Sequence, residues 1–181
     1  MSNSTIRVKN GIRYPTKNGW HQISVWGEPY ERGYAHGLLL ADEIKEGFNT
    51  MKFAMYDSHG LPMSFFVEAS NFLFKNTIKN NFPKIYEELK GIADGSRKNG
   101  SGISLDELIL LNNLVSIDYA LSYLHSNADK VHTMSAENKK LIKSIGSSTL
   151  EGGADDRCSA FIAVGDYTKD GKICCATQLL H

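Results

Sequence analysis

A block of helical periodicity covers residues 29–124 and is flanked on both sides by segments that alternate like β-strands. Inside the block, apolar residues recur at steps of three and four, which places them on one face of an α-helix. Strand-like runs occur at residues 12–27 before the block and at 158–180 after it. Two strands alone do not form a stable sheet, so the second pair must either dock with the first or belong to a longer arrangement. The order of elements predicts an α+β fold with an N-terminal β-hairpin, a helical segment and a second hairpin.

A tight turn joins the two strands of the first pair. The run IRY at residues 12–14 and the run HQISVWG at residues 21–27 flank a polar stretch that contains Asn18 and Gly19. These two residue types tolerate the positive φ angles that a two-residue hairpin turn requires. We therefore expect a β-hairpin at this position.

The first helix, predicted over residues 28–56, carries one apolar stripe and two glycines. Pro29 suits the first turn of a helix, because its missing N–H would have no partner there. Gly33 and Gly37 lie at positions where glycine costs helix stability. We expect these two glycines to let another backbone approach closely. The stripe consists of Tyr34, Leu38, Ala41, Ile44, Phe48, Met51 and Met55.

Two shorter helices are expected after the first. One begins near Pro62 and carries an apolar run that includes Phe65 and Phe66. The other begins near Pro83 and is predicted to end at Gly95, because the sequence that follows, SRKNGSG, is polar and rich in glycine.

The last helix of the block is predicted over residues 105–124. It is preceded by the sequence SLDE, in which Ser104 and Glu107 have the spacing of a capping box. The helix is apolar nearly all round, so we expect it to be the most buried one. Asn112 and Asp118 need hydrogen-bonding partners if they face the interior.

Residues 125–157 differ in composition from the helices before them. They are mostly polar, and their one amphipathic piece, at residues 139–145, is short. A long polar stretch of this kind is typical of a linker or a functional loop. We therefore divide the chain into a hairpin and helical segment at 1–124, a linker at 125–157 and a second hairpin at 158–181.

The composition excludes several classes of protein. Lys and Arg total 20 and Asp and Glu total 20, so no net charge attracts a nucleic acid. No apolar run is long enough to span a bilayer, and the N-terminus lacks the apolar core of a secretory signal. The chain has 3 cysteines, of which Cys174 and Cys175 are adjacent, and this pattern is not a disulfide framework. We expect a protein of a reducing compartment, with the cytoplasm as the default location.

Cys158 is the main candidate for a reactive residue. It follows the polar stretch GGADDR and begins the apolar run CSAFIAV. A structural role is the common alternative, since free cysteines are usually buried. If the chain were cut before Cys158, the new α-amine, with a pKa of about 8, could take the thiol proton as a general base. One residue would then supply both the nucleophile and the base.

The evidence for a functional role is weaker for the other candidate side chains. We interpret His36 as a structural histidine of the first helix. His125 and His132 have no second pair of ligands nearby, and their spacing is poor evidence for a metal site. Gly33 and Gly37 do not follow the strand and loop pattern of a nucleotide-binding motif. We therefore expect neither a metal nor a cofactor.

Three stretches of the chain together resemble a known family of enzymes. The first is a glycine-rich helix start, the second is a Leu-Asn pair in a later helix, and the third is a cysteine motif followed by a Thr-x-Asp-Gly-Lys turn. In these features the chain is similar to the isopenicillin-N acyltransferase-like cysteine peptidases. These are N-terminal-nucleophile hydrolases, more distantly akin to phospholipase B-like proteins and acid ceramidases. The matching residues are Gly27, Glu31, Gly33, His36, Gly37, Leu111, Asn112, Cys158 to Phe161 and Thr168 to Lys172.

The resemblance implies an αββα fold, of which this chain carries the N-terminal part, and a precursor that cuts itself between Arg157 and Cys158. It implies amide hydrolysis or acyl transfer on a small-molecule amide or acyl substrate, through a thioester on Cys158. We expect Asp155 or Asp156 to assist proton transfer and Gln178 to support the site. The chain departs from the family where Gln178 replaces an asparagine, and Arg157 is larger than the usual residue before the cysteine. The alternative is a truncated or degenerate relative that serves as a non-catalytic binding or scaffold domain.

Overall fold

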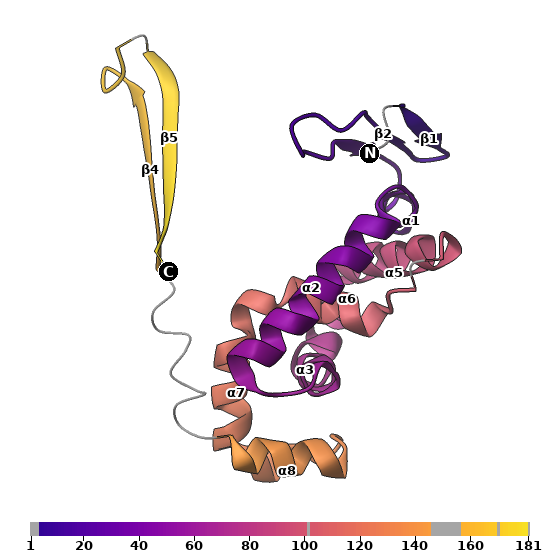
Figure 1. Ribbon diagram of the computed structural model, residues 1–181, viewed down its shortest axis with the longest axis vertical. Helices are drawn as coiled ribbons and strands as arrows, with labels where there is room; N and C mark the ends of the chain where they lie inside the picture. The colour runs from indigo at the N-terminus through magenta and orange to yellow at the C-terminus, as the bar shows by residue number, and fades with distance from the viewer. Residues whose placement is uncertain (1–3, 101, 146–156, 170, 181) are drawn as a thin grey trace.

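In the computed structural model, one antiparallel sheet precedes the helices along the chain and a second follows them (Figure 1). The structure describes residues 4–100, 102–145, 157–169 and 171–180. The chain runs from a small N-terminal sheet through the helices to a two-stranded ribbon. This is an α+β architecture, as the sequence predicts.

The N-terminal sheet is antiparallel, with the strand order β1-β2-β3. Its strands are β1 (Ile6–Val8), β2 (Gly11–Arg13) and β3 (Ile23–Val25). In the turn between β2 and β3, Asn18 has a φ of 53° and Gly19 a φ of 79°. The predicted hairpin is therefore confirmed, and β1 adds a third strand that the sequence pattern does not indicate.

Helices follow one another from residue 29 to residue 144. Their bounds are α1 (Pro29–Leu39), α2 (Ala41–His59), α3 (Met63–Ser70), α4 (Asn76–Asn81), α5 (Pro83–Lys98), α6 (Leu105–Asn112), α7 (Ile117–Ser126) and α8 (Ala136–Ser144). A π-helical turn, Asn71–Lys75, links α3 to α4, and 3-10 turns at Leu114–Ser116 and Ala128–Lys130 flank α7. None of the described helices is long and apolar enough to cross a membrane.

An elbow at Leu40 interrupts the helix predicted over residues 28–56. α1 ends at Leu39, and Leu40 has a φ of −124° and a ψ of 29°. The first sheet supplies the reason, because Arg13 Nη1 donates a hydrogen bond to Leu39 O at 2.9 Å. In a continuous helix that carbonyl oxygen would accept from a backbone N–H one turn later. The prediction of one uninterrupted helix is therefore wrong at the elbow.

α1 and α5 cross with their backbones in contact. A Cβ atom built at Gly33 would lie 2.1 Å from Glu88 O, and one built at Gly37 would lie 2.2 Å from Ile92 O. These distances are far below the contacts that real Cβ atoms make, so only glycine fits at either position. The predicted close approach at Gly33 and Gly37 is confirmed.

α5 contributes two glycines of its own to this crossing. A Cβ atom at Gly91 would lie 2.2 Å from Tyr30 O, and one at Gly95 would lie 2.2 Å from Tyr34 O. α5 continues past Gly95 to Lys98. The predicted helix end at Gly95 is wrong, because this glycine serves helix packing and does not terminate the helix.

The core lies between α2, α3, α5, α6, α7 and α8. Its largest fully buried apolar side chains are Phe65, Phe66, Ile109, Leu110, Leu121, Leu124, Ile142 and Val131. The capping box before α6 is present, since Ser104 Oγ accepts from Glu107 N at 3.2 Å and Glu107 Oε2 accepts from Ser104 N at 2.7 Å. The sequence therefore locates the start of α6 correctly.

The apolar stretch 105–124 is neither one helix nor buried on all sides. The 3-10 turn between α6 and α7 divides it, and Val115 and Tyr119 are 92% and 73% exposed. Asp118 Oδ1 lies 3.6 Å from His59 Nε2 of α2, and this buried oxygen has no hydrogen-bond partner among the described residues. The expectation that this stretch is the most buried holds for one face only.

The segment predicted as a linker is folded as far as Ile145. α7 extends through Ser126, and the side chains of Val131, Met134, Ile142 and Ile145 are buried in the core. The boundary predicted at residue 125 is therefore too early. A few apolar residues, spaced widely along a polar stretch, are enough to hold that stretch against the helical body.

Glu68 of α3 fixes the start of α8 to the helical body. Its carboxylate accepts hydrogen bonds from Ser135 N at 2.5 Å, from Ser135 Oγ at 2.9 Å and from Asn138 Nδ2. Ser135 also caps α8, since its hydroxyl accepts from Asn138 N at 3.3 Å. A residue far away in the sequence thus completes the cap of this helix.

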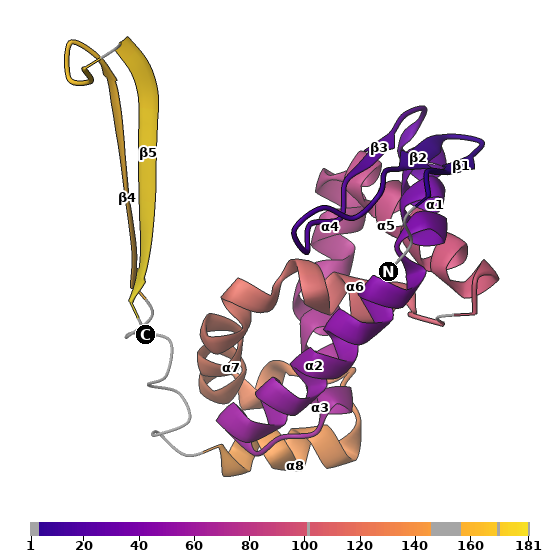
Figure 2. The same ribbon diagram turned by 45° about the horizontal axis from the view of Figure 1, so that its top comes forward.

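The ribbon consists of β4 (Arg157–Gly165) and β5 (Gly171–Leu180), paired antiparallel. Gly165 and Gly171 have φ angles of 60° and 70° at the ends of the turn. The ribbon forms a sheet of its own and, in both views, stands apart from the helices and from the N-terminal sheet (Figure 1 and Figure 2). Among the described residues, the two sheets do not join.

Candidate functional site

Cys158 lies at the open end of the ribbon. It is the second residue of β4 and pairs with Leu179 of β5, at the end opposite the turn. The bond predicted to be cut, between Arg157 and Cys158, is therefore the first peptide bond of the strand. Asp155 and Asp156, which we expect to assist proton transfer, lie outside the described residues.

Gln178 and Cys158 occupy positions on opposite faces of the ribbon. Gln178 pairs with Ser159, and successive residues of a strand alternate between the two faces of a sheet. Thr177 pairs with Ala160, so its position shares a face with that of Cys158. The register does not bring Gln178 to the face of Cys158 and places Thr177 there instead. The sequence could not identify Thr177, because the register of the two strands is not visible in the sequence alone.

Gly27 and Glu31 of the motif shape the start of α1. Gly27 has a φ of 98°, a region that glycine adopts without strain. Glu28 is the N-cap of α1, and Glu31 Oε2 accepts a hydrogen bond from Glu28 N at 3.2 Å in a capping box. Both motif residues therefore have a structural role at the helix start.

Three other motif residues, distant in sequence, line one groove. His36 of α1, with Leu111 and Asn112 of α6, borders a groove of about 320 Å³ beside the elbow, called here the elbow groove. Glu43 and Gly47 of α2 also line it, and apolar side chains of α2, α5 and α6 complete its wall. The fold thus brings together two of the stretches that carry the family resemblance.

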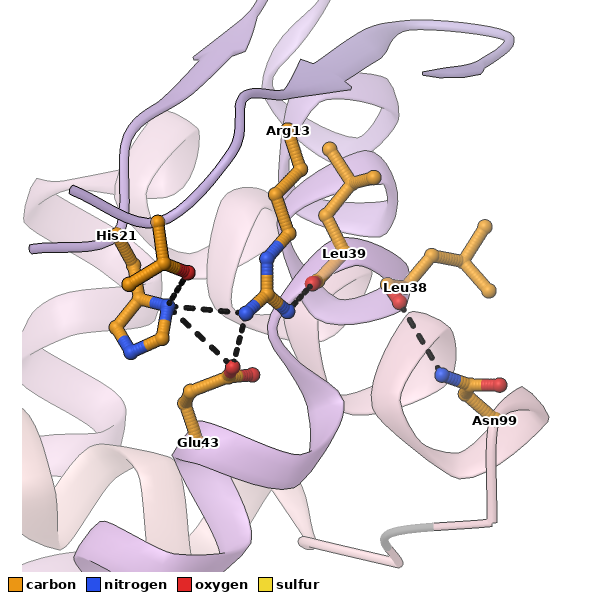
Figure 3. Close-up of polar contacts among 7 residues, drawn as sticks. Arg13, His21, Leu38, Leu39, Glu43 and Asn99 are labelled. Atoms are coloured by element: carbon orange, nitrogen blue, oxygen red, sulfur yellow. Dashed lines mark hydrogen bonds and ion pairs between the residues drawn. The ribbon is translucent and has the colours of Figure 1, made fainter. Parts of the chain in front are cut away.

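Arg13 lies at the centre of a polar cluster between the N-terminal sheet and the elbow (Figure 3). Its guanidinium pairs with Glu43 Oε1, and its Nη2 lies 2.9 Å from His21 Nδ1. Because arginine can only donate, His21 Nδ1 accepts in this arrangement. Asn99 Nδ2 donates to Leu38 O at 3.3 Å and ties the end of α5 to the end of α1.

The Glu43 carboxylate is held ionised by the cluster. Burial by itself would raise its pKa, but the hydrogen bond and charge of Arg13 hold the pKa of Glu43 below its usual value. Glu43 Oε2 is buried and has no hydrogen-bond partner among the described residues. Arginine stays protonated and cannot act as a base, and the Arg13 side chain is held by the Glu43 carboxylate and the Leu39 carbonyl, so we assign the cluster a structural role.

The surroundings of His36 on α1 favour the neutral form of its imidazole. Burial lowers the pKa of its imidazole, and the Glu88 carboxylate opposes this only in part. Glu88 is itself paired, because its Oε2 lies 2.6 Å from Arg32 Nη2. Within the described part of the chain, no set of three or more His, Cys, Asp or Glu side chains is placed to hold a metal ion.

An archaeal protein is similar to most of this chain. A protein from Archaeoglobus fulgidus, described as uncharacterized, is 28% identical over 160 residues, which cover 86% of this chain. The chain spans about a quarter of the length of that relative, since the match covers 24% of it. No family model and no solved structure matches the chain. The description of the relative names no activity.

Proposed function

We propose that this protein is a self-processing amidohydrolase or acyltransferase of the N-terminal-nucleophile type, with Cys158 as its nucleophile. The observation that carries the proposal is the position of Cys158 at the start of β4, at the open end of an antiparallel ribbon. The resemblance of the cysteine motif and its turn to the isopenicillin-N acyltransferase-like cysteine peptidases supports the same assignment. Cleavage before Cys158 would leave its α-amine at the end of a strand.

Self-cleavage would proceed through an acyl shift. Cys158 Sγ attacks the carbonyl carbon of Arg157, the peptide C–N bond breaks, and the thiol proton passes to the released α-amine. Water then opens the thioester, which frees the carboxylate of Arg157 and regenerates the thiol. The α-amine titrates with a pKa of about 8, so it can serve as the general base in later turnovers.

The substrate of the mature protein would be a linear amide. The α-amine of Cys158 takes the thiol proton, the sulfur attacks the amide carbon, and the leaving amine departs with that proton. The acyl group then sits on Cys158 as a thioester until water or a second amine removes it. Water gives hydrolysis, and an amine gives acyl transfer.

The intact mass of the full-length protein tests this proposal. We expect two fragments that meet between Arg157 and Cys158, and one uncleaved species for Cys158→Ala. Cys158→Ser should be cleaved slowly, because a hydroxyl makes the same shift with a poorer nucleophile. Cys174→Ala is the matched control, and it should be cleaved like the parent.

Activity provides the second measurement. Hydrolysis of a series of N-acyl p-nitroanilides should accompany cleavage and be lost in Cys158→Ala. A parent protein that remains a single species, or a Cys158→Ala variant that still cleaves amides, would show that Cys158 is a packing residue. The protein would then be the non-catalytic binding or scaffold relative, a role that the elbow groove in the helical body favours.

A further inference from the structure

Gly47 lies inside α2 without a neighbour that requires a glycine. Glycine is less favourable than alanine in the interior of a helix. At Gly33 and Gly37 a crossing backbone explains the glycine, but a Cβ atom at Gly47 would meet no atom of the described residues within 4 Å. Gly47 instead lines the elbow groove, where it leaves the backbone of α2 bare. A bare backbone allows close approach of a ligand.

Two polar side chains border the same groove with hydrogen-bonding capacity to spare. The His36 side chain makes no hydrogen bond within the described part of the chain, and its neutral ring has one donor and one acceptor nitrogen. Asn112 Nδ2 donates to Leu108 O at 3.2 Å, so the side-chain oxygen of Asn112 remains as an acceptor. The groove thus presents both a donor and acceptors beside an apolar wall.

The charges around the groove are already balanced. Glu43, which lines the groove, pairs with Arg13, and Glu88, which lies near His36, pairs with Arg32. An anionic ligand would meet two carboxylates, and a cationic one would lose its hydration against an apolar wall beside carboxylates whose charge Arg13 and Arg32 already neutralise. An uncharged ligand matches this environment.

We propose that the elbow groove binds a small uncharged carboxamide, whose apolar body lies on α2 at Gly47 and whose amide group lies between His36 and Asn112. An amide N–H suits the side-chain oxygen of Asn112, and the amide oxygen suits the ring N–H of His36. Ligand pockets range from roughly 300 to 1,000 Å³. A groove of about 320 Å³ therefore takes a ligand at the small end of that range.

Hexanamide is the probe that tests this site, with hexanoate and hexylammonium as charged analogues of similar length. The test uses the Cys158→Ala chain, so the result is independent of the nucleophile and of the function proposed for it. We expect saturable amide NMR shifts centred on Gly47 and Asn112, with a Kd on the order of 1 mM for a ligand of this size. The two charged analogues should bind at least about tenfold more weakly.

Three variants locate the binding. Gly47→Leu fills the groove and should abolish the shifts without lowering the melting temperature, since leucine favours the helix. Asn49→Leu, at an exposed position of the same helix, is the matched control and should bind hexanamide like the parent. Asn112→Leu should weaken binding about three- to tenfold through the lost hydrogen bond. Absence of saturable shifts, equal binding of hexanoate or hexylammonium, or unchanged binding in Gly47→Leu would each overturn the proposal.

Discussion

Gly37→Ala should destabilise the protein, although alanine is the better helix former. Its Cβ atom would lie 2.2 Å from Ile92 O and 2.7 Å from Ser96 N, both of which are backbone atoms that cannot rotate away. Ordinary contact begins at 3.4 Å, so α1 and α5 would have to separate by about 1 Å. A gap of that size removes a quarter to a half of the dispersion energy of each contact that opens.

The net effect follows from two opposed contributions. Overpacking of this kind lowers the free energy of unfolding by about 3 kcal/mol at the upper end of its usual range. Replacing glycine by alanine in a helix raises it by about 1 kcal/mol. The free energy of unfolding should therefore fall by about 2 kcal/mol. In a chain of this length, that change lowers the melting temperature by about 4–8 °C. Leucine at the same position should destabilise further.

Gly47→Ala is the matched control for this experiment. It makes the same chemical change in a neighbouring helix, but its Cβ atom would meet no atom within 4 Å in the part of the chain that the structure describes. It should therefore raise the melting temperature by about 2–4 °C, in line with about 1 kcal/mol of helix propensity. Thermal unfolding followed by circular dichroism measures both variants. If Gly37→Ala melts at or above the parent temperature, α1 and α5 are not in backbone contact and the packing argument fails.

Two carboxylates give further predictions. The folded pKa of Glu43 is lower than its unfolded value, so ionised Glu43 stabilises the fold above about pH 4.3 and loses this effect as the pH falls through the folded pKa. Glu43→Gln should therefore lose less of its free energy of unfolding than the parent between about pH 5 and pH 3. Denaturant titration at several pH values measures this. If the variant loses as much stability as the parent, Arg13 does not hold Glu43 ionised. Glu68→Ala should release the start of α8 and expose Lys139 and Lys140 to trypsin, whereas Glu137→Ala, on the exposed side of α8, should leave these bonds protected. Equal cleavage of the two variants, mapped by mass spectrometry, would show that Glu68 does not hold the helix.

Local signals in the sequence predict the parts of the fold that depend on neighbours in the chain. Asn18 and Gly19 are adjacent, and their preference for positive φ angles is sufficient to indicate the β2–β3 turn. Ser104 and Glu107 belong to the same helical turn, so their capping box is visible without a structure. The spacing of Gly33 and Gly37 indicates a close approach, although it does not identify α5 as the partner.

The errors arise where a distant residue decides the local structure. The elbow at Leu40 depends on a hydrogen bond from Arg13, and the cap of α8 depends on Glu68. Neither contact is encoded in the periodicity of the helix that it affects. The polar composition of residues 125–145 is typical of a linker. In the structure, widely spaced apolar side chains such as Met134 and Ile142 are buried in the core and hold this segment against the helices.

The candidate site is predictable to a similar extent. The change from a polar stretch to an apolar run places Cys158 at the start of a strand, and β4 agrees with this. The resemblance alone points to Gln178, whereas the face on which a residue of β5 lies depends on strand register, which puts the position of Thr177, and not that of Gln178, on the face of Cys158. The elbow groove was not predicted at all, because its walls come from four helices whose packing is not encoded in any single stretch.

The glycine crossing also limits how the helical body can move. Each glycine of α1 lies against a carbonyl oxygen of α5, and each glycine of α5 lies against one of α1. Sliding one helix by a single residue would push bulky side chains such as Tyr34 or Ile92 onto the opposite backbone. We therefore expect the two helices to move together as one rigid unit. A displacement of the end of α1, where Arg13 binds the Leu39 carbonyl, would therefore move α5 as well.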